Sequence, residues 1–294
     1  METEEAALRQ LLAAVIEGQA RAIATVNASS EALLAGARLM AAAWRGGGRV
    51  IYLGVGASGG VALQDFAEQP GTFGIPPSQL VFISSDTPGQ AYLGNAEDDL
   101  DAGARTMANV EPIAGDIIIA VTASGTTRFT LGAAAEGKRH GARIVSLTCT
   151  KGSPLQTLAD VAIVTETGNE AVTGSTRLAA GTAHKAALGA MSTLAGAMLG
   201  HIYRGHMVNM RASNAKLRER ALTIVFDITG VSRVEAERAL QATNLDVKAA
   251  ILSALGAPYP TLLNEACGGD LATAIMGLGA VKAASGPAAQ IQED

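Results

Sequence analysis

Five short, almost entirely apolar runs constrain the fold of this 294-residue chain more than any other feature. Helical stretches separate them. Strands that are apolar on both faces are typical of a parallel sheet covered by helices on both sides, with right-handed crossovers between the strands. We therefore expect an α/β fold with an open five-stranded parallel sheet flanked by helices. The predicted strands are Val50–Leu53, Leu80–Ser84, Ile117–Val121, Ile144–Thr148 and Val161–Thr165.

Helical patterns precede and follow this sheet region. Residues 4–45 carry apolar side chains at helical spacing and predict two helices that meet near residues 27–30, where Asn and Ser can cap the second start. Residues 175–211 are rich in Ala, Gly and Met and predict one long helix that is apolar nearly all round. Such a helix is typical of a core or a subunit interface. Residues 213–228 predict an amphipathic helix.

The C-terminal part predicts a separate helical unit. Residues 230–256 predict a compact three-helix unit, in which Ser232 and Glu235 have the spacing of a capping box. The chain therefore divides into three predicted segments. They are N-terminal helices at 1–45, a sheet domain at 46–212 and a C-terminal helical region at 213–294.

Charge and cysteine usage exclude several classes of protein. There are 22 basic and 27 acidic residues, a net charge of −5, and no basic cluster that would favour nucleic acid. Cys149 and Cys267 have no metal-ligand or redox spacing and suit a reducing compartment. The N-terminus is acidic, unlike a signal peptide, and the longest apolar stretch, residues 186–200, is shorter than a membrane span. We expect a soluble cytoplasmic protein with no nucleic-acid or membrane partner.

Two loops combine glycines with hydroxyl side chains, and each follows a predicted strand and opens a helix. The first, residues 54–60, contains Gly56, Ser58 and Gly59; the second is residues 122–127. Helix N-termini at the carboxyl ends of parallel strands bind anions through free N–H groups and the positive end of the dipole. The two loops together predict a phosphate-binding cradle, although either loop alone could be an ordinary strand-to-helix turn. The second loop contributes Thr122, Ser124, Gly125 and Thr127.

The order of these motifs resembles the sugar isomerase (SIS) family, and more narrowly the N-acetylmuramic acid 6-phosphate etherases. The resemblance runs collinearly from about residue 46 to 256. Its most specific piece is TGSTRLAAGTAHK at residues 173–185, and further matching pieces are AEQPGTFG at 67–74 and NAEDD at 95–99. The unit at 230–256 is similar to the ubiquitin-associated (UBA) type of helical domain at the end of these etherases.

The resemblance implies a lyase that removes the D-lactyl ether from N-acetylmuramic acid 6-phosphate. It implies two catalytic glutamates, Glu68 and Glu97, which suits the chemistry because two carboxyl groups can move the protons without a metal or cofactor. It also implies that the hydroxyls of the two loops hold the sugar phosphate, that His184 and Lys185 approach the site, and that the protein is a homodimer with sites near the interface.

Each of these residues also has a plain structural reading. Glu68 could be a solvated surface group, and Glu97 could belong to an acidic helix start. His184 could be a hydrogen-bonded histidine at an interface, and Lys185 could be a charge on a helix face. Glu170, just before the 173–185 segment, could bind sugar or hold the loop at the start of that segment in place.

Two other functions remain open at this stage. One is an aldose–ketose isomerase of sugar phosphates, and the other is a non-catalytic sugar-phosphate sensor that regulates a partner. The sensor stays open because arginine and lysine positions of the family are replaced here: the second loop reads SGTTRF, with its arginine at Arg128, and Leu178-Ala179 stands in the signature segment.

Overall fold

The computed structural model describes residues 2–85, 97–212 and 214–284, and the chain forms two compact units. The first unit comprises the chain up to Gln69 and Ile75–Ala195. The second joins Pro70–Gly74 to the chain from Gly196 onward. The second unit thus begins inside the segment that the sequence predicts as one long helix.

The first unit contains a five-stranded sheet in the order β2-β1-β3-β4-β5, with every neighbouring pair parallel. The predicted open parallel sheet is therefore confirmed. After β1 the chain crosses to β2 on one side, while β3 lies on the other side of β1, so the direction of winding reverses between β1 and β3. The strands are β1 Val50–Gly54, β2 Leu80–Ile83, β3 Ile117–Val121, β4 Arg143–Thr148 and β5 Val161–Val164.

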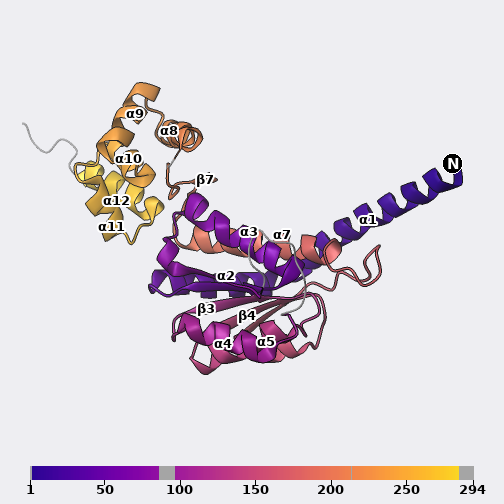
Figure 1. The fold of residues 1–294 in the computed structure, drawn as a ribbon. Helices are drawn as coiled ribbons and strands as arrows, with labels where there is room; N and C mark the ends of the chain where they lie inside the picture. The colour runs from indigo at the N-terminus through magenta and orange to yellow at the C-terminus, as the bar shows by residue number, and fades with distance from the viewer. Residues whose placement is uncertain (1, 86–96, 213, 285–294) are drawn as a thin grey trace, which may run out of the picture. The chain divides into compact units, whose positions relative to one another are not determined.

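Helices cover both faces of the sheet (Figure 1). On one face lie α2 (Ser30–Arg45), α3 (Gly56–Phe73) and α7 (Ala179–Met198); on the other lie α4 (Leu100–Val110) and α5 (Arg128–Arg139). Alternate strand residues face opposite layers: Ile118 packs with Phe129 of α5, whereas the Tyr52 hydroxyl reaches α3. Short helices η1 (Pro77–Gln79) and α6 (Pro154–Leu158) complete this unit.

The two helices on the α4/α5 face approach each other through glycines. A Cβ atom at Gly103 would lie 2.0 Å from the Phe129 carbonyl oxygen, and one at Gly132 would lie 1.9 Å from the Leu100 carbonyl oxygen. Real side chains cannot occupy such space, so both positions require glycine. Asp99 caps the start of α4 by accepting a hydrogen bond from the Ala102 amide at 2.8 Å.

At the amino edge of the sheet, Asp116 is 1% exposed and is held by Arg49. The Arg49 backbone amide and Nε donate to its carboxylate at 2.8 and 3.1 Å, and the guanidinium Nη2 lies 2.6 Å from Oδ2. Bonds between a guanidinium and a carboxylate are among the stronger ones in proteins. This pair fixes the beginning of β1 to the beginning of β3.

The two predicted N-terminal helices are confirmed as α1 (Glu2–Ala28) and α2. Ser29 lies between them but its side chain makes no capping hydrogen bond. Its hydroxyl instead donates to the Val164 carbonyl oxygen at 2.8 Å, which ties the helix junction to β5.

The prediction of one helix over residues 175–211 is wrong at its C-terminal end. Helix α7 ends at Met198, and a two-stranded antiparallel hairpin follows, formed by β6 (Ile202–Tyr203) and β7 (His206–Met207). Gly200 has φ of +67°, a left-handed conformation that ends helices and favours glycine. The uniform Ala/Gly/Met composition conceals this end, because apolar residues continue past it.

Beyond the hairpin the second unit is helical, as predicted for the C-terminal region, and the capping box of Ser232 and Glu235 is present. Residues 230–256 contain two helices rather than three, α9 (Arg233–Ala242) and α10 (Val247–Ala254). The neighbouring helices are α8 (Ala215–Thr229), α11 (Pro260–Ala266) and α12 (Leu271–Ala284), and all five helices contribute to one apolar cluster.

Candidate functional site

The two predicted cradle loops begin at paired strand ends. Gly54, the last residue of β1, is in register with Val121, the last residue of β3. Helix α3 starts within the first loop segment, at Gly56, and α5 starts directly after the second, at Arg128. The loops therefore lie side by side at the carboxyl edge, where the winding reverses, with two helix N-termini at the same place. This is the position at which open α/β sheets bind ligands, and it suits an anion.

The first loop is shaped by a close backbone contact. A Cβ atom at Gly59 would lie 2.7 Å from the Gly54 carbonyl oxygen, so the first turn of α3 rests directly on the end of β1. Gly56 begins α3 and Ser58 is partly exposed in its first turn. The arrangement leaves a serine hydroxyl and backbone amides near the strand end.

The second loop holds a group of linked hydroxyls. The Oγ1 atoms of Thr122 and Thr127 lie 2.8 Å apart, and Ser124 Oγ lies 3.5 Å from Thr122 Oγ1. Ser124 Oγ also accepts hydrogen bonds from the amide and hydroxyl of Thr126 at 3.2 and 2.9 Å. Gly125 has φ of +69°, which lets the loop turn back. The hydroxyls converge without a cation among them, so an anion here would be held by neutral donors and helix dipoles.

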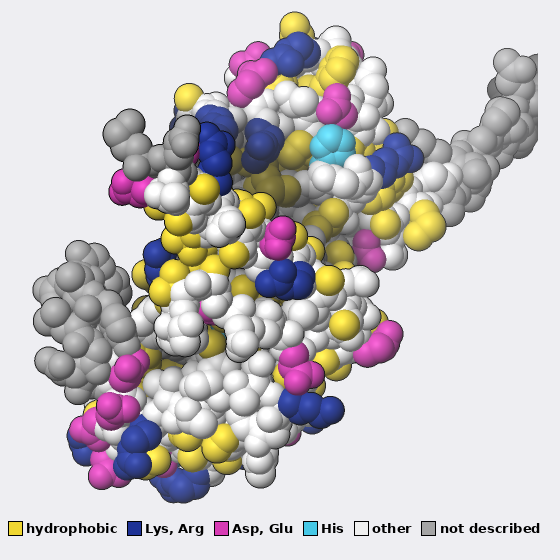
Figure 2. All heavy atoms as spheres, turned by 90° about the vertical axis from the view of Figure 1, so that its right-hand side faces the viewer, with side chains coloured by type: hydrophobic (Ala, Val, Ile, Leu, Met, Phe, Trp, Pro, Cys, Tyr) yellow, Lys and Arg dark blue, Asp and Glu magenta, His cyan; other side chains and the backbone are white. Residues whose placement is uncertain are grey.

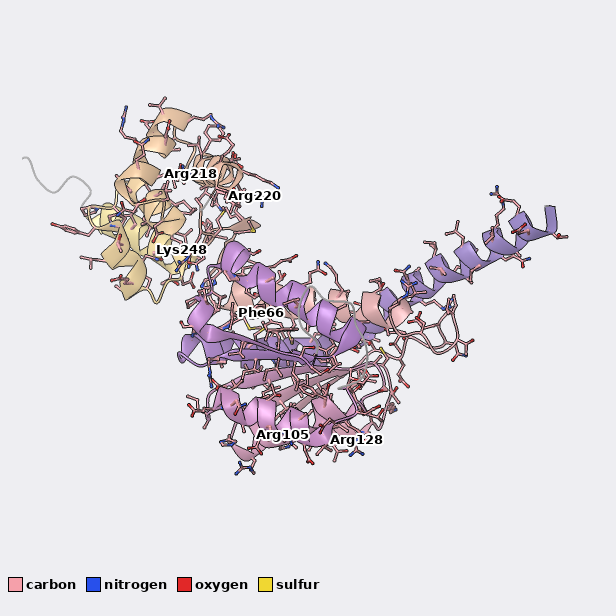
Figure 3. All side chains as sticks on the ribbon, in the orientation of Figure 1. Phe66, Arg105, Arg128, Arg218, Arg220 and Lys248 are labelled. Carbon is pink, nitrogen blue, oxygen red and sulfur yellow. The ribbon has the colours of Figure 1, made fainter. Side chains whose placement is uncertain are left out.

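The Glu97 backbone is held directly beside the second loop. The Phe129 amide donates to the Glu97 carbonyl oxygen at 2.9 Å, and Arg128 Nε donates to the Asp98 carbonyl oxygen at 2.9 Å. Arg128, labelled in Figure 3, thus binds the segment that carries Glu97. The arginine of the SGTTRF motif therefore has a positioning contact. The preceding residues of the NAEDD motif, 95 and 96, lie outside the described residues.

Glu68 is exposed on the fourth turn of α3, away from both loops. It lines a hollow of about 20 Å³ together with Asp65, Gln64 and Lys185 of α7. Gln64 Nε2 donates to Glu68 Oε1 at 3.4 Å. The structure therefore brings Glu68 and Lys185 together, but it does not bring Glu68 to the cradle of its own chain.

His184 lies in the core and not at the surface of the cradle. It is 1% exposed, and its Nε2 lies 3.3 Å from Cys149 Sγ. Burial lowers the pKa of His184 to about 4 and raises the pKa of the Cys149 thiol, so this pair is neutral near pH 7.

Glu170 accepts hydrogen bonds from the amides of Ala179 and Ala180 at 3.0 and 3.2 Å. It therefore ties the chain just before the 173–185 segment to the start of α7.

The environments of His184, which is buried, and His201, which is half-buried, lead us to expect a loss of stability in mild acid. Burial lowers the pKa of both His184 and His201 to about 4, with the Lys248 charge adding to the effect at His201. The unfolded chain binds these protons near pH 6.5 and the folded chain does not, so the stabilising difference is present above pH 6.5 and is lost as the pH falls toward 4. Each histidine can contribute up to about 3 kcal/mol. Urea unfolding at pH 7.5, 6, 5 and 4 measures this, and a flat profile would contradict it.

Sequence reasoning missed the carboxylate of Asp65, which accepts hydrogen bonds from Tyr52, Gln69 and Ser192 next to Glu68. The one available signal was its place one helical turn before Glu68. Its partners lie 13 and 127 positions away for Tyr52 and Ser192, so only the fold reveals the cluster.

Charge is dispersed over the face drawn in Figure 2, where Lys and Arg side chains alternate with Asp and Glu. Within residues 2–85, 97–212 and 214–284, no group of three His, Cys, Asp or Glu side chains could hold a metal ion. In the same part of the chain, every helix is too short or too polar to cross a membrane.

Comparison with known proteins identifies clear relatives. The family model described as SIS domain matches residues 8–149. N-acetylmuramic acid 6-phosphate etherases of Yersinia pestis and Yersinia pseudotuberculosis are 41% identical over 219 residues, which is 74% of this chain and 74% of theirs.

Solved structures share the fold at low identity. A protein of Listeria monocytogenes described as a proposed sugar-phosphate isomerase is 19% identical, with a TM-score of 0.51 over 65% of this chain and 91% of that one. An Escherichia coli protein, solved in complex with a ligand, is 18% identical, with a TM-score of 0.51 over 68% of this chain and 95% of that one. The predicted SIS fold is confirmed.

Proposed function

Because the chain belongs to the N-acetylmuramic acid 6-phosphate etherase family, we propose that it is a lyase that converts this sugar phosphate to N-acetylglucosamine 6-phosphate and D-lactate. The observation that carries the proposal is the 41% identity to etherases over 74% of the chain. The convergent hydroxyls of Thr122, Ser124 and Thr127 beside two helix N-termini support a phosphate ligand.

The reaction needs two proton-handling groups. In the open-chain sugar the aldehyde acidifies the proton on carbon 2. We assign Glu97 as the base that removes it and Glu68 as the acid that protonates the ether oxygen while the bond from carbon 3 to oxygen breaks. D-lactate leaves and a 2,3-unsaturated aldehyde remains. Water, activated by Glu68, adds at carbon 3 and a proton returns to carbon 2, so the net change is addition of one water.

Glu68 and the cradle lie too far apart within one chain to serve one hexose phosphate. Gly56 and Glu68 are 12 residues apart on α3, which is about 18 Å at a helical rise of 1.5 Å per residue. The bonds that join the phosphorus atom to the oxygen on carbon 3 span at most about 8 Å, and an extended glutamate side chain adds about 5 Å, so the two together fall short of that separation. We infer that the enzyme is a homodimer and that each cradle receives Glu68 from the partner subunit.

An antiparallel contact between two α3 helices would give this arrangement. The exposed positions of α3 form a stripe of mostly small residues at helical spacing, Ala57, Gly60, Gln64 and Ala67, which permits close approach of two helices. A two-fold axis beside Gln64 would place Glu68 opposite the beginning of the second turn of the partner's α3, near the cradle. Such a contact is self-complementary, as a two-fold dimer requires.

The two cysteines bear on where the enzyme acts. Cys149 and Cys267 are both free thiols, which fits a reducing compartment. We propose that the reaction takes place in the cytoplasm.

Incubation of the purified protein with N-acetylmuramic acid 6-phosphate tests the reaction. The expected result is release of one D-lactate per N-acetylglucosamine 6-phosphate formed, with solvent oxygen from ¹⁸O-labelled water found on carbon 3 of the product. Formation of a ketose without lactate would favour the isomerase. Binding of the sugar phosphate without any turnover would favour the sensor.

A further inference from the structure

Asp65 is a mostly buried carboxylate one helical turn before Glu68, and the chemistry above does not use it. Its Oδ2 accepts hydrogen bonds from the Tyr52 hydroxyl at 2.8 Å and the Gln69 amide at 3.0 Å, and its Oδ1 accepts one from the Ser192 hydroxyl at 2.9 Å. These three donors are between 0% and 3% exposed. Burial of a carboxylate is costly unless hydrogen bonds satisfy it, and here three neutral donors do so.

The three donors come from three elements that carry the candidate site. Tyr52 lies in the middle of β1, Gln69 follows on α3, and Ser192 lies on α7. The carboxylate therefore fixes the third turn of α3 against both the sheet and α7. Glu68 projects from the next turn of the same helix, so its position depends on this attachment.

Asp65 also shapes the charge around Glu68. Asp65, Glu68 and Lys185 line the same hollow. Burial raises the pKa of Asp65; the hydrogen bonds from Tyr52 and Ser192 oppose this, the Glu68 charge adds to it, and the Lys185 charge opposes it. Electrostatic interaction is mutual, so the Asp65 charge also acts on the Glu68 carboxyl group.

We propose that Asp65 is a positioning residue for Glu68, which fixes the helix that carries the acid and whose charge, together with that of Lys185, acts on the Glu68 carboxyl group across the hollow that the three residues line. The inference rests on the proposed function of Glu68. It is distinct from catalysis by Asp65 itself, since Asp65 is enclosed by its three donors.

The test is the pH profile of kcat/KM for lactate release in Asp65→Asn, which keeps the shape of the side chain and removes the charge. The alkaline limb, where the acid loses its proton, is expected to move to lower pH by about 0.5–1 unit. Lys185→Gln, at an exposed position, is expected to move it in the opposite direction. The matched control is Asp116→Asn, which loses a buried and anchored carboxylate at the other edge of the sheet and is expected to leave the limb in place.

A readout independent of turnover separates this inference from the proposed function. Titration of the Glu68 carboxyl carbon by ¹³C NMR, with the resonance assigned by its absence in Glu68→Gln, is expected to show a lower midpoint in Asp65→Asn and a higher one in Lys185→Gln. If the unaltered protein releases no lactate, the proposed function fails while the titration still tests the charge coupling. Midpoints that do not move, or a kcat that falls equally at every pH, would overturn the inference.

Discussion

Glu68→Gln and Glu97→Gln proteins are each expected to release lactate about 10³-fold more slowly than the unaltered protein, and an equimolar mixture of the two is expected to regain about a quarter of its activity. The individual losses follow from the usual contribution of a general acid or base, about 10²–10⁴ in rate. The recovery follows from the separation of about 18 Å along α3 between Glu68 and the cradle of its own chain.

The expected recovery comes from counting sites. Random exchange makes half of the dimers mixed. In a mixed dimer, one cradle keeps Glu97 and receives Glu68 from the partner, and the other cradle lacks both. Half of the dimers therefore have one intact site of two. The measurement is lactate release after the two variants are co-refolded, with each variant refolded alone as the control.

The shared site would be contradicted if the mixture were as inactive as each variant alone, because both glutamates would then act within one chain.

A disulfide cross-linking experiment tests the α3 contact without turnover. In a background with Cys149→Ser and Cys267→Ser, Gln64→Cys is expected to form a disulfide-linked dimer under mild oxidation. The control is Arg105→Cys, a position whose side chain is 68% exposed on α4 in the opposite helical layer, which is expected to stay monomeric on a non-reducing gel.

The sheet and the cradle could be predicted because their signals are local. Each strand is a short apolar run, and each loop begins at the residue after a strand, so parallel pairing alone brings Gly54 beside Val121. The end of α7 could not be found in the same way. Its termination depends on Gly200, where a Cβ atom would lie 2.9 Å from the Cα of Asp270, and this contact spans 70 positions of sequence.

The proposed catalytic arrangement could be predicted only in part from the sequence. The family resemblance identified Glu68 and Glu97 as the two glutamates. Their positions in the sequence did not predict the distance between them in space. The length of α3 puts Glu68 about 18 Å from the cradle of its own chain, and the sequence without the fold does not give that distance. Asp65 was missed for a related reason, because its partners come from β1 and α7 and no local pattern marks a buried carboxylate.

The α4/α5 contact should be the most sensitive part of the first unit to a single methyl group. Gly103→Ala is expected to lower stability by about 3 kcal/mol or more, because its Cβ would lie 2.0 Å from the Phe129 carbonyl oxygen and backbone cannot move aside as a flexible side chain can. The two helices would have to separate. Since the Phe129 amide also holds the Glu97 carbonyl oxygen at 2.9 Å, the separation is expected to move Glu97 and lower kcat as well.

Urea unfolding and lactate release by the same preparation measure both effects. The matched control is Gly277→Ala in α12, where nothing lies within 4 Å of the added methyl group; helix propensity predicts a gain of about 0.5–1 kcal/mol there. The two substitutions add the same atoms to helical glycines, so their difference isolates the close contact from the intrinsic preference of alanine for helices. A Gly103→Ala protein as stable as the unaltered one would show that α4 and α5 can shift apart without cost, and that Glu97 is not held in place by their contact.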